Sequence, residues 1–484
     1  MDFYEKELKR RESLSLNEKT KLLNELLKRA KFFDENWYYF LRGIRLYEEG
    51  KVSEAINLME KAFYLEKNLM FCQFITKIYE ENKDEVNKKL WLKKKNNLVR
   101  FLRTEDQNKL LINHKETIKR KLLDHANGNL TIAEQYIKRY FDRKDNLIDS
   151  EISYIKVLKE WSSSTPLMYQ GVEQNENVGG GFFIRWKNKG IVIDPGLNFV
   201  QNLHKANLSV LDIDIVIVTH NHIDHNSDLK VILDIKYQCE SALQYSNIKL
   251  NTWEKDQVSR SIRFYVDHST YEEHRKNFEE NKCDVTQFDT IISQKEKQHI
   301  KYSDSIEIQY FKTIHINQGV SYGIVLDLKN GDTCKKIGFT SDTKYFPELP
   351  VHMSEVDYLI ANLSEIEKAD LCKKGYKYNH LGYHGCCDLI CHNEIYPTYF
   401  ILSEFWGGKG DIRQEIAQYL KIDSLSCKKD IYIIAGDTEL CIDLENDNIR
   451  CSKCGGFVHR DNIAVQNTEG RKLIYICNRC EIKK

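Results

Sequence analysis

A cluster of histidines and aspartates directly after an apolar run constrains this chain more than any other feature. Residues 213–218 (IDIVIV) are typical of a buried strand, and the next ten residues, THNHIDHNSD, carry three imidazoles and two carboxylates. If these polar side chains were buried in a core, each would require a hydrogen-bonding partner, and a solvated loop does not require such a cluster. Neutral imidazole and carboxylate are used together as metal ligands. The spacing predicts that His220 and His222 bind one metal, while Asp224 and His225 bind a second metal beside it.

The length and composition of the chain predict a multidomain protein. Its 484 residues exceed one ordinary core, and 72 basic residues balance 72 acidic ones, so the whole-chain charge indicates no partner. The charged N-terminus and the absence of an 18-residue apolar run favour a cytoplasmic protein with no membrane segment. Of the 14 cysteines, four form a regular C-terminal pattern, and the scattered placement of the other ten favours reduced thiols.

Residues 1–160 are predicted to be helical. Residues 37–62 resemble one tetratricopeptide repeat, with Gly43, Ala55 and Ala62 where the two helices of such a hairpin touch. An ordinary helical hairpin is the alternative. A single hairpin cannot bury its own face, so its neighbours must stack on it, and a protein partner can dock on such a region.

The segment 83–121 is strongly basic. It holds 13 basic and 5 acidic residues. A solvated helical face accounts for this charge, and a surface that faces nucleic acid or an acidic partner is the alternative.

Residues 161–446 are predicted to form an α/β layered sandwich. Short β-rich runs alternate with helical stretches, which favours this class over an all-β domain. The predicted strands are 182–186, 190–193, 213–218, 305–311, 322–328 and 336–340, and the predicted helices include 228–244 and 411–420.

Residues 447–484 are predicted to be a small zinc-binding module. They contain two CxxC pairs with 22 residues between them, and 38 residues cannot hold a core alone. Four thiolates in this arrangement bind one tetrahedral zinc ion. The module resembles a zinc ribbon, and its predicted ligands are Cys451, Cys454, Cys477 and Cys480.

The stretch from His220 to His225 resembles the HxHxDH signature of the metallo-β-lactamase superfamily, which has two β-sheets flanked by helices. The resemblance implies two active-site divalent metals, zinc or manganese. It also implies that Asp194 supports the histidine loop through hydrogen bonds, that His315 completes the first site, and that Asp342 bridges both metals.

The chain looks most similar to the ribonuclease Z branch of this superfamily. By this resemblance His380 helps to protonate the leaving group; His384 can trade places with it, and a structural histidine is the alternative. Where relatives carry a last histidine ligand, this chain has Glu404. A carboxylate there would favour manganese at the second site, or would indicate a weak second site.

A glycine-rich turn, residues 406–413 (WGGKGDIR), follows Glu404. Its backbone N–H groups can approach an anion, and Lys409 and Arg413 supply positive charge. We therefore predict phosphate binding by these two residues, with a tight turn into a helix as the alternative.

The predicted function is that of a metal-dependent phosphodiesterase, most specifically a nuclease with DNA or RNA as its substrate. A metal-bound hydroxide would be the nucleophile, with Asp224 as its metal ligand and His380 as the proton donor. Hydrolysis of a small ester, lactone or cyclic nucleotide is one alternative. A catalytically weak repeat-containing scaffold is the other.

Overall fold

The computed structural model describes residues 3–143, 152–162, 179–246, 248–315, 320–331, 333–364, 366–372, 379–406, 411–468 and 472–481. The chain divides into two compact units, residues 1–127 and 128–484. Among the described helices, none is long and apolar enough to cross a membrane.

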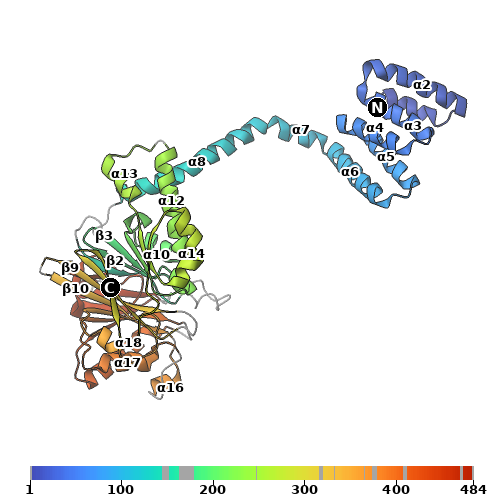
Figure 1. Ribbon diagram of the computed structural model, residues 1–484. Helices are drawn as coiled ribbons and strands as arrows, with labels where there is room; N and C mark the ends of the chain where they lie inside the picture. Colours follow the sequence, from blue (N-terminus) through green and yellow to red (C-terminus); the bar gives the residue numbers. More distant parts are fainter. Residues whose placement is uncertain are drawn as a thin grey trace. The chain divides into compact units, whose positions relative to one another are not determined.

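The N-terminal unit is helical (Figure 1). Trp37 and Phe40 pack against Phe71 in its core, with ring centroids 4.9 and 4.1 Å away. The helices are α1 (Phe3–Arg11), α2 (Leu16–Phe33), α3 (Glu35–Glu48), α4 (Val52–Leu65), α5 (Leu69–Glu81), α6 (Glu85–Arg103), α7 (Glu105–Asn113) and α8 (Lys115–Asp142), which ends in the second unit.

The hairpin of α3 and α4 is the segment that resembles a tetratricopeptide repeat. A Cβ atom at Gly43 would lie 2.6 Å from Met59 Cγ and 3.0 Å from the Ala55 carbonyl oxygen. The predicted close contact between these two helices is therefore present, since only a residue without a side chain fits there. The repeat family itself stays a prediction.

The second unit contains two mixed sheets. The nine-stranded sheet has the order β16-β15-β14-β1-β2-β3-β4-β5-β6, and the seven-stranded sheet has the order β13-β12-β11-β10-β9-β8-β7. The strands of the first sheet are β1 (Tyr154–Val157), β2 (Phe182–Trp186), β3 (Lys189–Ile193), β4 (Ile215–Val218), β5 (Arg263–Val266), β6 (Asp284–Gln287), β14 (Cys441–Asp443), β15 (Asn448–Arg450) and β16 (Phe457–His459). Those of the second are β7 (Lys297–Ser303), β8 (Ile306–Lys312), β9 (Tyr322–Asn330), β10 (Thr333–Phe339), β11 (Tyr358–Ser364), β12 (Tyr399–Phe405) and β13 (Tyr432–Ala435).

The two sheets pack face to face between layers of helices. In β3, Ile191 and Ile193 belong to the core shared with the seven-stranded sheet, whereas Val192 points to the opposite face and packs with helix residues. In Figure 1, α12 and α14 lie beside the first sheet and α17 and α18 beside the second. The helices are α10 (Phe199–Lys205), α11 (Ile223–Asn226), α12 (Leu229–Tyr245), α13 (Thr252–Ser259), α14 (His268–Glu280), α15 (Leu349–His352), α16 (Lys368–Leu371), α17 (Gly382–Cys391) and α18 (Arg413–Ser426), with a 3₁₀ turn at Val210–Asp212.

The sheet domain begins before the predicted boundary at residue 161, because β1 lies between β14 and β2. The C-terminal module also shares this sheet, since β15 pairs with β14 and β16 extends the edge. Its remaining elements are a 3₁₀ turn at Arg460–Asn462, the hairpin of β17 (Ile463–Asn467) and β18 (Leu473–Cys477), and the short helix α19 (Asn478–Glu481).

One pair of cysteines departs from the prediction of reduced thiols. Cys391, at the end of α17, forms a disulfide with Cys427, which caps the end of α18. A spacing of 36 residues gives no sign of this contact; it arises because the two helices pack against each other.

Candidate metal centre

The candidate site lies where several strands end at one edge of the two facing sheets. β3 and β4 are parallel, as are β10, β11 and β12. β8 runs in the same direction as β10, because each is antiparallel to β9. Residues that directly follow these strands therefore meet, as side chains at the carboxyl ends of parallel strands do.

The histidine loop follows β4, and the short helix α11 holds its second half. A Cβ atom at Gly196 would lie 1.9 Å from the Asp224 carbonyl oxygen, so the loop after β3 packs directly against α11. His222 is the N-cap of this helix, and Asp224 and His225 lie within it. This turn places His220 and His222 in one group of candidate ligands and Asp224 and His225 in another.

Three histidine nitrogens converge in the first ligand group. Nδ1 of His222 lies 3.1 Å from Nε2 of His220 and 3.1 Å from Nε2 of His315. Ligand atoms around a tetrahedral ion with bonds of about 2.0–2.1 Å are roughly 3.3 Å apart, so these separations suit a metal such as zinc. Oδ2 of Asp342 lies 3.6 Å from His315 Nε2 and 4.0 Å from His220 Nε2, which completes a group of four.

Hydrogen bonds on the far side of the His315 and His220 rings fix which of their nitrogens faces the centre. His315 Nδ1 lies 2.9 Å from the carbonyl oxygen of Asn379, so this nitrogen carries the hydrogen and Nε2 presents its lone pair. His220 Nδ1 lies 3.1 Å from Thr219 Oγ1, whose own hydrogen is donated to Asp194. We assign the hydrogen of His220 to Nδ1 for the same reason, which leaves Nε2 as a ligand atom.

Asp342 links the first ligand group to the second. Its Oδ2 lies 3.5 Å from His225 Nε2, and Asp224, His225 and Asp342 form the second group of candidate ligands. Asn362 Nδ2 donates to the other oxygen, Oδ1, at 2.9 Å. That bond leaves Oδ2 directed at the space between the two groups, where a bridging ligand is needed.

Asp194 connects the strand end to the histidine loop. Its carboxylate accepts hydrogen bonds of 2.8 Å from the backbone N–H of Thr219, from the Thr219 hydroxyl and from His225 Nδ1. The resemblance predicted this supporting role. Since Nδ1 of His225 donates to Asp194, a neutral His225 directs its Nε2 lone pair at the second group.

The charges around His225 favour a cation. Burial lowers the pKa of His225, but the carboxylates of Asp194, Asp342 and Asp224 outweigh burial and raise this pKa to about 10. Burial, together with the neighbouring ring of His225, holds the pKa of His220 well below its usual value, so that ring is neutral. His225 Nε2 is buried and has no hydrogen-bond partner in the part of the chain that the structure describes. A divalent ion that replaces the proton on this atom would satisfy both the nitrogen and the carboxylates, so the second group fits a metal.

Glu404 lies at the edge of the second group but is engaged elsewhere. Its Oε1 is 4.0 Å from His225 Nε2, and the ammonium of Lys159 contacts the same oxygen. Both side chains are buried. Metal binding by Glu404 stays a prediction, and Lys159 is a residue of the site that the sequence did not indicate.

His380 lies beside the centre, whereas His384 faces another partner. His380 Nδ1 is 3.9 Å from Asp342 Oδ2, and its ring centroid is 4.8 Å from that of His315. Burial lowers the pKa of His380. His384 Nε2 lies 3.3 Å from Asp388 on its own helix, so the geometry favours His380 for a role at the centre.

Of the predicted phosphate-binding pair, the structure describes only Arg413. Lys409 lies outside the described residues. Arg413 is buried, with its guanidinium 2.9 Å from Asp411 and 3.0 Å from Asp437, and it stacks 4.3 Å from the ring of Trp161. These contacts give Arg413 a structural role, in which it ties α18 to the segment after β1.

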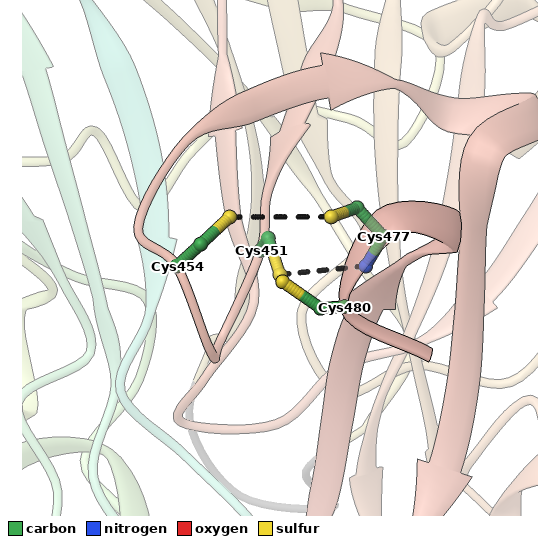
Figure 2. A group of neighbouring side chains, drawn as sticks. All are labelled: Cys451, Cys454, Cys477 and Cys480. Atoms are coloured by element: carbon green, nitrogen blue, oxygen red, sulfur yellow. Dashed lines mark hydrogen bonds between the residues drawn. The ribbon is translucent and has the colours of Figure 1, made fainter. Parts of the chain in front are cut away.

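The four C-terminal cysteines form a separate cluster in Figure 2. Cys454 Sγ and Cys477 Sγ are 3.9 Å apart, close to the roughly 3.8 Å between thiolates on one zinc with bonds of about 2.3 Å. Burial would raise the pKa of Cys451, but hydrogen bonds from backbone N–H groups, including those of Cys454 and Cys477, lower it to about 6. These features fit a bound zinc ion, which stays a prediction, as does the zinc-ribbon class.

The comparison with protein families gives one partial match. The family described as anti-Pycsar protein Apyc1 matches residues 173–364, less than half of the chain. This segment includes the histidine loop, His315 and Asp342. No curated protein matches the chain.

Solved structures with a similar fold include metallo-β-lactamase-fold proteins. The Bacillus subtilis protein YhfI, of this fold, has a TM-score of 0.44 and 12% identity, over 60% of this chain and 98% of its own. The short form of human tRNase Z has a TM-score of 0.41 and 14% identity, over 60% and 99%. Yeast PDE1 has a TM-score of 0.42 and 12% identity, over 59% and 98%. The sheet domain is similar to these folds. At such values the likeness concerns the fold, and we base the function on the residues of this chain.

Proposed function

We propose that this protein is a metal-dependent phosphodiesterase, and specifically a nuclease. The observation that carries the proposal is the pair of adjacent ligand groups that share Asp342. His220, His222, His315 and Asp342 would hold the first ion, and Asp224, His225 and Asp342 the second. Divalent metals held side by side lower the pKa of bound water and stabilise the oxygens of an in-line displacement at phosphorus.

The chain's own residues would perform the remaining tasks. Asp194 and Asn379 fix the rings of His225 and His315, so that the ligand atoms are in place before substrate arrives. The side chain of His380 is 17% exposed, so it can reach a substrate at the centre. We assign it the transfer of a proton to the leaving-group oxygen.

A substrate panel tests the proposal. Purified protein reloaded with manganese or zinc would be offered single- and double-stranded DNA, RNA, cyclic nucleotides, a chromogenic phosphodiester and a lactone. We expect turnover of the nucleic acids and of the chromogenic diester. His222→Ala should abolish this turnover, whereas His299→Ala, an exposed histidine on β7, is the matched control and should retain it.

Other outcomes would replace the proposal with one of the alternatives. Turnover of cyclic nucleotides or of the lactone alone would identify a hydrolase of small molecules. No turnover of any substrate by the metal-loaded protein would favour a scaffold role.

The basic helix α6 is our candidate for guiding nucleic acid to the centre. Lys89 and Lys93 are exposed on this helix. A double charge reversal, Lys89→Glu with Lys93→Glu, should weaken RNA or DNA binding and reduce its salt dependence, since each phosphate contact releases counterions. Hydrolysis of the chromogenic diester should not change. If the variant binds nucleic acid as tightly as the wild type, α6 does not contact nucleic acid and its charges are only solvated.

A further inference from the structure

Lys159 and Glu404 form a buried ion pair at the second ligand group. Lys159 lies just after β1 and Glu404 near the end of β12, and both side chains are almost inaccessible to solvent. Burying two charges is costly unless they are paired. The contact between Lys159 Nζ and Glu404 Oε1 supplies that pairing.

The backbone fixes Lys159 in this place. The N–H of Leu158 donates to the Gly181 carbonyl oxygen at 2.9 Å, and the N–H of Ser162 donates to the Phe405 carbonyl oxygen at 2.9 Å. The segment between these two bonds therefore spans from the first sheet to the end of β12. Because it is held on both sides, its lysine is directed at the site by the fold and not by a flexible surface loop.

The ion pair engages the Glu404 oxygen that lies beside the second group. Oε1 of Glu404 is the oxygen that lies 4.0 Å from His225 Nε2, and Lys159 contacts this same atom. Burial lowers the pKa of Lys159, and the nearby carboxylates of Asp224, Asp194 and Asp342 act against this by attracting the ammonium. The Oε2 atom is buried without a hydrogen-bond partner among the described residues. Glu404 is thus near the second group, yet the neutral pair adds no net charge to it, and the oxygen measured against His225, Oε1, is already engaged by the ammonium.

We propose that Lys159 is a positioning residue that withholds Glu404 from the second metal. Asp224, His225 and Asp342 alone then bind the second ion, which is held more weakly than the first ion with its four ligands. The protein would carry one tight and one weak metal in this centre. This inference rests on the metal centre of the proposed function, but its test does not require catalysis.

The test is a manganese titration of protein that keeps its cysteine-bound zinc, followed by electron paramagnetic resonance. Lys159→Met should tighten the second site roughly tenfold or more, because it frees a carboxylate close to the ion. Glu404→Gln should weaken the site by a similar factor, since it leaves an unpaired ammonium there. The double variant should bind the second ion with the wild-type constant, because it also has no net charge and no fourth ligand.

Lys236→Met is the matched control. Lys236 is buried and pairs with Glu240 at 2.9 Å, away from the metal residues, so this change should not alter metal binding. Circular dichroism and the content of cysteine-bound zinc check that every variant is folded.

Two results would overturn the inference while leaving the proposed function intact. One is a double variant that binds the second ion roughly tenfold more weakly than the wild type, which would make Glu404 a ligand already. The other is a folded Lys159→Met variant with an unchanged second site. If manganese does not bind outside the cysteine cluster in any variant, the metal centre itself is refuted, and both proposals fall with it.

Discussion

Asp194 shows how one carboxylate at a strand end can hold candidate metal ligands in place without belonging to either ligand group. Its three hydrogen bonds join the end of β3, Thr219 and the ring of His225. Such a residue sets the orientation of a ligand, and thereby how well the ligand atom is presented to the ion.

Asp194→Ala should therefore weaken binding at the second site about 10–100-fold, because His225 loses the acceptor that fixes its ring. The measurement is the dissociation constant for manganese. Asp214→Ala is the control: Asp214 is also buried, but it pairs with Lys189 at 3.0 Å and Arg260 at 3.1 Å. Its loss should lower the melting temperature without changing metal affinity. Equal metal affinity in the Asp194 variant would contradict the role we assign.

His380→Ala should reduce turnover about 10²–10⁴-fold for substrates whose leaving group needs a proton, such as a nucleoside. A nitrophenolate leaving group needs no proton, so hydrolysis of the chromogenic diester should change little. The check is the ratio of kcat for the two kinds of substrate. His384→Ala should leave this ratio unchanged. If His384→Ala changes the ratio and His380→Ala does not, His384 is the proton donor.

Residues in short local patterns could be predicted from the sequence, and residues joined across the fold could not. His220, His222, Asp224 and His225 are close in sequence, so their spacing alone indicates where their side chains point. Lys159 contacts a residue 245 positions away, and no sequence motif predicts such a pair. Arg413 was predicted to bind phosphate because it follows a glycine-rich turn, but its guanidinium pairs with Asp411 and Asp437 inside the protein.

At the level of elements, strands with a strong apolar pattern were predicted well. β2 matches its predicted range, and β4 and β9 differ from theirs only at an end. β1 was not predicted, because its four residues carry no alternation and all four are buried between two neighbouring strands. The short strands β15 and β16 depend on their neighbours and on the cysteine cluster, which a local pattern cannot show.

The α3–α4 hairpin offers a test of helix packing. Gly43→Leu should destabilise the N-terminal unit by about 1–3 kcal/mol, because the side chain would clash with Met59 and the Ala55 carbonyl oxygen. Hydrogen exchange of α3 and α4 in the full chain measures this loss. Hydrolysis of the chromogenic diester should not change, since the proposed metal ligands all lie in the second unit.

Gly50→Asn, in the turn between α3 and α4, is the matched control for this hairpin. Gly50 has φ +77°, a conformation that asparagine tolerates, and no heavy atom lies within 4 Å of a Cβ built there. Exchange rates that rise equally in both variants would show that the close contact at Gly43 is not what holds the hairpin.

At the scale of the whole molecule, the cysteine cluster and the large sheet are parts of one structure. The N–H of Cys451 donates to the Gly456 carbonyl oxygen at 2.9 Å, which closes the loop between β15 and β16. Tyr475, in the C-terminal hairpin, donates to the Ala435 carbonyl oxygen at 2.7 Å. The predicted zinc-binding module is therefore packed against the sheet domain.

Cys477→Ser should remove one zinc ion per chain and speed hydrogen exchange in β14, β15 and β16, because these strands are consecutive in one sheet. Metal analysis and exchange mass spectrometry measure the two effects. Cys283→Ser, a thiol outside the cluster, should change neither. Full zinc content in the Cys477 variant would refute the zinc assignment.

The position of β16 at the end of the nine-stranded sheet has a consequence for solubility. An outermost strand exposes a row of unpaired backbone groups that can pair with another chain, and very short strands limit this hazard. β15 and β16 have three residues each and cover β14. If their loop loses its metal and they detach, β14 becomes the outermost strand. β14 is equally short, with three residues, so loss of the metal would still leave a short edge, and a chelator should not cause aggregation for as long as the domain stays folded.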